Sequence, residues 1–487
     1  MRFARASGVA CAGVFLLGAC SSPEPKPLEA SAQARALLER RLDDPRLQRF
    51  ISSRHRPSSQ APEATDHPSA LPVPGAATWD LDRLTLAALY FHPDLPIARS
   101  RLRMAQAHAV SARAWPAPSL SASLGRGAGA AVASPWIVGA AIDVVLEAGN
   151  RRALRAAQAD ALVDAARADL TQASWAVRAR VYAALLDCWS AQRRLEPLRV
   201  SLDLQSRRAD LYERRVDAGE NARADWRREL AQREQFSVAL AQAQADLAQS
   251  RADLAQAIGV TVEALDGISL DLESIDRAPD FDGSSIGPGL RERALTGRAD
   301  VQDALAQLAA AQADLQIELS RRWPDVRLGP GYQFDLGANK YAVTMGLDWP
   351  RATDGPIAEA TARRELAARE LLALQARVLS RIDHAVALWQ TTAPMAQSAG
   401  LMMAQAEQRE QSAEHLFAAG ALDRPSLLAA RLDRIESARV RQAALERQRR
   451  ALAALEDAVQ ATLEPGRPGP VAPEADPDPG VAAVSLP

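Results

Sequence analysis

Two aspartates at matching places in the chain are candidates for a role in a pore. Asp143 and Asp348 each lie near the end of a short stretch in which apolar residues alternate with small or polar ones. A ring of carboxylates around a pore favours the passage of cations. The alternative is that each carboxylate is simply solvated on the wet face of a strand, and the sequence leaves both interpretations open.

Catalytic and metal-binding motifs are absent from the sequence. It contains no nucleophile elbow, phosphate-binding loop, zinc motif or pair of carboxylates at catalytic spacing. The six histidines are scattered, and none has a partner at metal-ligand spacing. A formal charge of -2 with 24% charged residues gives no reason to expect a nucleic-acid partner. We therefore predict a protein that is not an enzyme and that uses no metal and no cofactor.

The first twenty residues predict a targeting segment that ends in a modified cysteine. A basic start is followed by an apolar run from Val9 to Leu17, which is too short to span a bilayer. Leu17-Gly18-Ala19-Cys20 then resembles the cleavage box of bacterial lipoproteins, in which the cysteine becomes the acylated first residue. Ser21, in the next position, resembles outer-membrane sorting. The alternative is an ordinary secretory signal that ends near a cysteine.

One stretch, Arg151 to Val216, is the element around which the rest of the chain is organised. It contains no glycine and a single proline, Pro197. Its apolar residues recur in steps of three, four and seven, which predicts one apolar stripe along a continuous helix. The stripe consists of Val163, Leu170, Val177, Val181, Leu185, Cys188, Leu195, Leu198 and Leu202. At about 1.5 Å per residue this helix is about 100 Å long, the size of a rod or of the wall of a duct.

A glycine turn ends this long helix. The helix breaks at Gly219, and a shorter helix from Ala224 to Ile258 follows, so the pair is predicted to be a lopsided antiparallel hairpin. Gly420 holds the equivalent place in the second half of the chain. A chain that reverses at these points needs φ > 0, which glycine adopts at little cost.

The whole arrangement occurs twice. The matched positions are Ala88-Leu89 with Ala294-Leu295 and Pro118 with Pro324 at an offset of 206 residues, and Gly219 with Gly420 at an offset of 201. Each repeat consists of a helix, a β-hairpin and a long helical hairpin. The predicted divisions are a signal peptide (1–19), a lipidated tether (20–78), a first repeat (79–265), a linker (266–289), a second repeat (290–463) and a disordered tail (464–487).

Each repeat also contains two stretches that alternate with a period of two, as strands do. In the second repeat one face consists of Tyr341, Val343, Met345, Leu347 and Trp349, and small or polar residues form the other. Strands of about ten residues with one apolar and one polar face are typical of transmembrane β-barrels. Four strands cannot close a barrel, and an open sheet edge cannot face lipid, so several chains must share one barrel.

This layout resembles the outer-membrane efflux protein family, the TolC family, and is most similar to its lipidated branch that serves heavy-metal and drug efflux. The resemblance covers Trp79 to Leu463 and depends on the duplication, Pro93-Asp94-Leu95, the two prolines before the strands and the two glycine turns. It implies a mainly α-helical homotrimer with a small β-barrel in outer-membrane lipid and a helical tube that extends into the periplasm of a Gram-negative bacterium. It also implies a passive exit duct for an inner-membrane pump, joined to the pump by a periplasmic adaptor.

The same resemblance assigns roles to the two glycine turns. The adaptor-docking tips would include Val216, Gly219, Phe417, Gly420 and Leu422. Some family members close these tips with an aspartate that pairs with an arginine and a tyrosine, and Asp225 matches the aspartate. However, Phe417 stands where the tyrosine would be and Leu422 where the arginine would be.

A periplasmic coiled-coil adaptor or structural protein without a pore is the alternative function. An adaptor would have one helical hairpin flanked by β-rich domains, whereas this chain has two hairpins, each preceded by alternating strands. The sequence indicates neither the exported substrate nor the class of pump.

The cysteine at the end of the targeting segment gives a first prediction. We expect Cys20→Ser to abolish acylation and cleavage by the lipoprotein route, because the thiol is the atom that receives the lipid. The measurement is incorporation of radiolabelled palmitate in cells. Label that still enters the Cys20→Ser protein would contradict the assignment.

Overall fold

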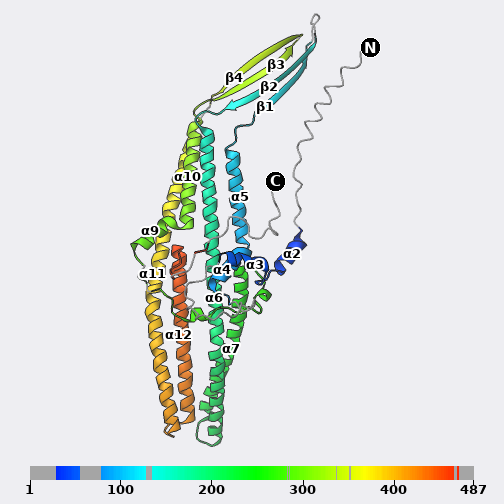
Figure 1. Ribbon diagram of the computed structural model, residues 1–487. Helices are drawn as coiled ribbons and strands as arrows, with labels where there is room; N and C mark the ends of the chain where they lie inside the picture. Colours follow the sequence, from blue (N-terminus) through cyan, green and yellow to red (C-terminus); the bar gives the residue numbers. More distant parts are fainter. Residues whose placement is uncertain are drawn as a thin grey trace, which may run out of the picture.

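The computed structural model describes residues 29–54, 78–127, 134–281, 283, 286–335, 337–349, 353–464 and 469–470. The chain forms a long bundle of helices with a four-stranded sheet at one end (Figure 1). At the other end lie the turns of two helical hairpins. The proposed signal peptide, Cys20 and nearly all of the C-terminal tail lie outside the described residues, so their roles stay predictions.

The same series of elements occurs twice, as the sequence repeat predicts. The first copy comprises α4 (Leu81–Phe91), α5 (Asp94–Ala112), β1 (Ser119–Arg126), β2 (Trp136–Leu146), α6 (Arg151–Asp217) and α7 (Arg223–Ile258). The second comprises α9 (Pro288–Gly297), α10 (Ala299–Ser320), β3 (Asp325–Asp335), β4 (Ala338–Asp348), α11 (Asp354–Ala418) and α12 (Arg424–Val459). Between them lie η1 (Val262–Leu265) and α8 (Glu273–Asp276). The predicted class, mainly helical with two β-hairpins and two long helical hairpins, is confirmed.

Helix α6 is the central element of the bundle. It is 67 residues long and packs against α5, α7, α10 and α12. Most of its predicted apolar stripe is buried, while Val163 and Leu202 at the two ends are half-buried. Pro197 lies inside α6 and Pro394 inside the 65-residue α11, and neither ends its helix.

The N-terminal segment packs on the middle of the bundle. It forms α2 (Ala30–Leu38) and α3 (Pro45–Arg54), and α3 buries Leu47 and Ile51 in the main hydrophobic core beside α4. Between these helices the Arg40 guanidinium donates hydrogen bonds of 2.9 Å to the carbonyl oxygens of Phe91 and Gly259. This segment is therefore part of the fold.

The four strands form one antiparallel sheet in the order β1-β2-β3-β4, so the two hairpins pair through β2 and β3. The loop between β3 and β4 is two residues long and includes Gly337 with φ of 98°. Ala338 and Asn339 belong to β4, because they pair with Asp335 and Phe334 in the ladder. Within the described residues, β1 and β4 each pair on one side only.

A buried ion pair holds the two repeats together at the middle of the bundle. Arg178 of α6 donates to the Glu456 carboxylate of α12 at 3.0 Å, and both side chains are at most 4% exposed. The backbone N–H of Leu463 donates to the other Glu456 oxygen at 2.9 Å. The rings of Trp175 and Tyr182 lie beside the Arg178 guanidinium.

Among the described residues, no helix combines the length and the apolar character that crossing a bilayer requires.

This ion pair gives a stability prediction. We expect Arg178→Leu to lower the free energy of unfolding by about 3–5 kcal/mol, because it leaves the Glu456 carboxylate buried without a cation. Arg178→Leu combined with Glu456→Leu should recover part of this loss. Arg101→Ala, which breaks an exposed ion pair with Asp169, is the control and should cost less than about 1 kcal/mol. Thermal unfolding in detergent measures all three, and a loss in Arg178→Leu no larger than the control would contradict the prediction.

Candidate functional site

One face of the sheet is apolar across all four strands. The register places Ile142 beside Leu120, and Tyr332 beside both Ala140 and Tyr341. Most of the large side chains on this face are well exposed, among them Leu120, Leu124, Val138, Ile142, Tyr341, Val343, Met345 and Leu347. A continuous exposed apolar surface on paired strands is typical of a surface that contacts lipid.

The opposite face of the sheet consists mainly of small residues. The register aligns Ser121 with Ala141, Ala141 with Gly331, and Gly331 with Ala342 across the four strands. Charged side chains on this face gather toward the strand ends, where Lys340 pairs with Asp335 at 2.5 Å and Arg327 with Asp348 at 2.7 Å. The middle of this face therefore has small, uncharged side chains.

The two aspartates predicted to line a lumen both lie on this small-residue face. The Asp143 carboxylate occupies the space beside Gly329 into which a Cβ at that glycine would project. Asp348 pairs in the register with Asp325, which lies four residues before Gly329 on β3. The two aspartates are therefore about 13 Å apart along the strand direction. The sheet does not bring the two carboxylates together, and Arg327 balances the charge of Asp348. A cation-favouring ring stays a prediction.

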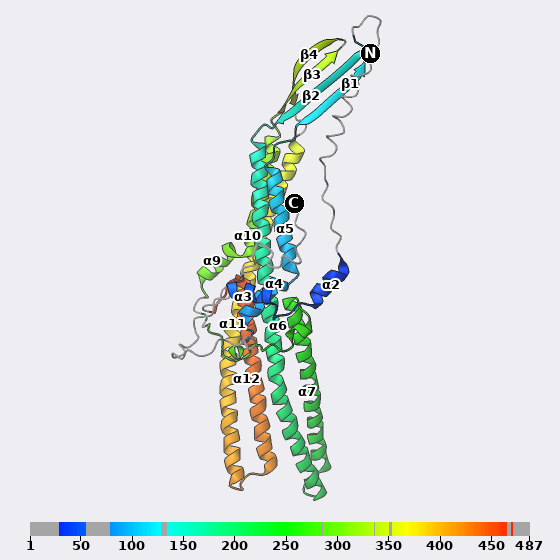
Figure 2. The ribbon, with the colours of Figure 1, turned by 45° about the vertical axis from the view of Figure 1, so that its right-hand side comes forward.

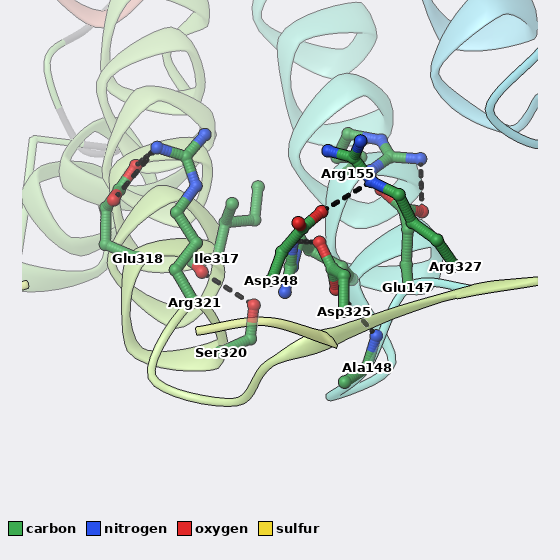
Figure 3. Close-up of polar contacts among 11 residues, drawn as sticks. Glu147, Ala148, Arg155, Ile317, Glu318, Ser320, Arg321, Asp325, Arg327 and Asp348 are labelled. Atoms are coloured by element: carbon green, nitrogen blue, oxygen red, sulfur yellow. Dashed lines mark hydrogen bonds and ion pairs between the residues drawn. The ribbon is translucent and has the colours of Figure 1, made fainter. Parts of the chain in front are cut away.

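Charged pairs join the sheet to the long helices, as Figure 3 shows. Asp325, the first residue of β3, accepts hydrogen bonds from the Ala148 N–H at 3.1 Å and from the Arg151 guanidinium at 2.8 Å. Glu147, just after β2, forms a bidentate pair with Arg155 in the first turns of α6. These contacts fix the direction in which α6 leaves the sheet.

The chain turns sharply at this junction. Gly149 and Asn150 have φ of 71° and 58°, and a Cβ on Gly149 would lie 3.0 Å from the Ser320 Cβ. Sequence reasoning missed the junction pairs. The one available signal was the charged residues directly outside the strands, and it did not indicate which of them would meet.

The two tips at the far end have the same backbone geometry. Gly219 and Gly420 have φ of 76° and 73°, which confirms the predicted positive φ, and nothing lies within 4 Å of a Cβ built on either. In each turn a backbone N–H donates to the carbonyl five residues earlier, from Glu220 to Arg215 at 2.8 Å and from Ala421 to Leu416 at 2.9 Å. This is the pattern of a glycine C-cap.

The tips expose few apolar groups. Phe417 is 39% exposed, and Val216 and Leu422 are half-buried. The structure thus places all the residues predicted to dock an adaptor at one end of the molecule, farthest from the sheet (Figures 1 and 2). Whether a partner binds there is a prediction.

An ion pair links the two tips. Arg215 of the first hairpin donates to Asp423 of the second at 3.0 Å, and Asp423 also caps α12 by accepting from the Ser426 N–H at 3.0 Å. The hydrogen bond from Ser426 and the nearby Arg215 lower the pKa of Asp423. Asp225, the predicted gate residue, instead pairs with Arg228 on its own helix at 3.3 Å. Its role as a gate stays a prediction.

The described residues contain no group of three His, Cys, Asp or Glu side chains that could hold a metal ion. The arrangement presents three kinds of surface: an apolar sheet face, a small-residue face and two exposed tips.

Comparison with known proteins finds one matching family model and one similar curated sequence. Residues 86–260 match the model of the outer membrane efflux protein family. The chain is 24% identical over 211 residues to the cobalt-zinc-cadmium resistance protein CzcC of Cupriavidus metallidurans, a match that covers 43% of this chain. It spans 49%, about half, of the length of that curated relative.

Solved structures share the fold over most of the chain. The outer-membrane channel OprN has a TM-score of 0.66 at 22% identity and covers 79% of this chain and 91% of its own. The outer membrane protein VceC of Vibrio cholerae has a TM-score of 0.63 at 20% identity, covering 79% and 97% of the two chains. CusC has a TM-score of 0.64 at 16% identity, covering 78% and 91%. At these identities the likeness shows the fold.

The capping role of Asp423 gives a local prediction. We expect Asp423→Ala to speed hydrogen exchange at the Ser426 N–H about fivefold, since loss of an N-cap costs about 1 kcal/mol. Asp423→Asn should speed it much less, because asparagine also caps helices. Asp225→Asn is the control and should leave this amide unchanged.

The pH dependence of the same amide follows from the lowered pKa. The contribution of the Asp423 carboxylate is complete above its ordinary pKa of 3.8 and is lost as the pH falls through the lower pKa of the folded state. Hydrogen exchange measured by mass spectrometry checks both statements. If Asp423→Asn exchanges as fast as Asp423→Ala, the ion pair with Arg215 rather than the cap stabilises this turn.

Proposed function

We propose, from the premise that the chain is a member of the outer membrane efflux protein family, that it is one subunit of an outer-membrane exit duct. The duct would conduct substrates passively after an inner-membrane pump and a periplasmic adaptor deliver them. The observation that supports this most directly is the sheet, which has one apolar face, one small-residue face and two edges that need partners.

The edges of the sheet argue for several copies of the chain. β1 and β4 each have one side without a strand partner among the described residues, and backbone groups that face lipid must be paired. If β4 of one copy pairs with β1 of the next, every strand has two neighbours and the sheet closes into a barrel. Three copies would supply twelve strands, a size at which the interior of a barrel can hold water.

The long helices argue for a duct below that barrel. Each chain contributes two hairpins, and the helices extend from the sheet to the tips (Figure 1). A ring of such hairpins would enclose a tube that extends into the periplasm. The tips, with Val216, Gly219, Phe417, Gly420 and Leu422, would then be the surface at which the adaptor docks.

The small-residue face argues for passive conduction. Ser121, Ala141, Gly331 and Ala342 would line the barrel without forming a binding pocket. The curated relative is named for cobalt, zinc and cadmium resistance, so divalent metal ions are one class of cargo that this duct would carry. Acylation of Cys20 would add a lipid anchor in the same membrane.

An adaptor or structural protein without a pore is the weaker candidate. Such a protein has no need of a sheet whose large apolar side chains face outward, and here Tyr341, Val343 and Met345 are 65% exposed or more.

The experiment compares assembly with export. The detergent-purified chain should be a trimer that conducts ions in a planar bilayer. Gly219→Val and Gly420→Val should still form trimers, because the sheet and the helical walls are unchanged. They should nevertheless lose most of the export in cells, since valine at a φ near 75° distorts the tip.

Two measurements check this prediction, trimer yield by native mass and export or resistance in cells. A glycine away from the turns provides the control. Gly289→Ala lies in α9 with nothing within 4 Å of the added Cβ, and it should change neither measurement. A stable monomer that conducts would contradict the proposed duct, and normal export by both valine variants would contradict the role of the tips.

A further inference from the structure

The two repeats differ at one buried position in the middle of the bundle. The offset of 201 residues that relates the two tip glycines also matches α6 with α11, and pairs of matched apolar side chains are buried in both helices. These pairs are Leu170 with Leu371, Val177 with Val378, Val181 with Ile382 and Leu185 with Val386. At the same offset Cys188 is matched with Trp389, and both are buried. A small side chain of the first repeat therefore stands at the position of an indole in the second.

In the second repeat the Trp389 indole fills the space beside α12. It forms a cluster with Ala451 and Leu452 of α12, and Phe281 and Ile286 of the linker between the repeats pack against this cluster. The ring centroids of Trp389 and Phe281 are 5.1 Å apart. The Trp389 side chain is only 4% exposed, so this part of the second repeat is a filled apolar core.

In the first repeat the matching region contains a cavity. It has a volume of about 320 Å³ and lies between α6, α7 and the segment that follows α7. Helices α6 and α7 lie side by side along this region (Figure 1). Cys188, Leu254 and Leu265 are buried parts of the cavity wall, and further leucine and isoleucine side chains complete it. Arg251, which also lines the cavity, matches Leu452 at the offset of 201 residues.

Polar groups lie at the edge of this cavity. Gln192 and Ser269 line it and are exposed, so they mark its opening to solvent. Arg251 is half-buried, and its guanidinium donates to the Leu265 carbonyl and to the Asp266 carboxylate, each at 3.3 Å. These bonds hold a cation beside an otherwise apolar space.

The interior of the cavity offers little to water. Burial raises the pKa of the Cys188 thiol, which is therefore neutral, and the thiol already hydrogen-bonds with Ser250. A buried water needs about two to four polar partners, whereas a cavity lined by leucine side chains binds small apolar molecules. An apolar cavity of about 150 Å³ holds benzene. This cavity, at about 320 Å³, has room for two fused rings.

We propose that this cavity is a binding site for a small neutral aromatic molecule with two fused rings, of the size of an indole. The second repeat carries an indole of its own chain at the matching position, in a helix with the same pattern of burial. A guanidinium beside an aromatic ring is attracted to its π-electrons, so Arg251 favours an aromatic over a saturated ring. The site lies within one chain and does not rest on the proposed duct.

Indole itself is the probe for this site. We expect it to bind the full chain in detergent with a Kd below about 1 mM, as the size of the molecule allows. Cyclohexanol, which is neutral but has no π-electrons, should bind at least about tenfold more weakly. Saturation-transfer NMR measures both, and detergent without protein gives the amount of each probe that the micelles take up.

Two variants close the site in different ways. Cys188→Trp places an indole where the second repeat has Trp389, and it should weaken the binding of indole at least about tenfold. Gln192→Trp adds a ring at the exposed opening and should have the same effect without changing the core. Gln256→Trp is the matched control, because Gln256 is exposed on α7 and does not line the cavity, and it should bind indole like the unsubstituted chain.

A third variant tests the preference for an aromatic ring. Arg251→Met removes the cation but keeps a long side chain at the edge of the cavity. We expect it to lose the preference for indole over cyclohexanol, while cyclohexanol binds as it does to the unsubstituted chain. A cavity that merely excludes water would show no such change.

The outcomes decide the inference separately from the proposed function. Indole that binds equally to Cys188→Trp, Gln192→Trp and Gln256→Trp would overturn the site, since the micelle or another surface would then hold it. Equal binding of indole and cyclohexanol to the unsubstituted chain would overturn the aromatic preference. A trimer that conducts ions but binds no indole would overturn the site and leave the duct intact.

Discussion

Backbone groups at the two edges of the sheet impose the constraint on which the rest of the structure depends. An unpaired N–H or C=O in contact with hydrocarbon costs several kcal/mol, so a sheet with a lipid-facing side must have no open edge. This sheet has four strands, and its edge strands β1 and β4 pair on one side only within the described residues. If the apolar face lies in lipid, as the proposed function requires, the edges need strand partners from other copies. In that case the backbone alone requires an oligomer, before any side chain is considered.

The helical part must then match the sheet in symmetry. The chain meets this requirement by duplication, because each repeat supplies one β-hairpin and one helical hairpin, and charged pairs such as Asp325 with Arg151 direct the helices away from the sheet. The two hairpins end in glycine turns of the same geometry at the same end. In the proposed assembly, one rotation between copies would therefore bring together both the strand edges and the helical walls of neighbouring chains.

The two repeats differ at the C-terminal ends of their last helices. In the second repeat Arg298 donates to the Asp457 and Ala458 carbonyls at the end of α12. The matching residue of the first repeat is His92, and there Arg40 of the N-terminal segment donates to the Gly259 carbonyl at the end of α7. Burial and the nearby Arg180 lower the pKa of His92, and its ring nitrogens face Arg180 and Asp94. The N-terminal segment thus provides a charge that the first repeat lacks.

Local properties of this protein could be read from its sequence, and contacts between distant segments could not. Helix lengths, the alternation of the strands and the positive φ of Gly219 and Gly420 follow from periodicity and from the conformational freedom of single residues, which neighbouring residues determine. The Arg178–Glu456 pair joins residues 278 positions apart, and nothing near either residue indicates the other. The same holds for the sides of α11. Leu371 and Leu388 are both leucines on one apolar helix, but only packing against α12 and α10 decides that Leu371 is buried and that Leu388 faces outward.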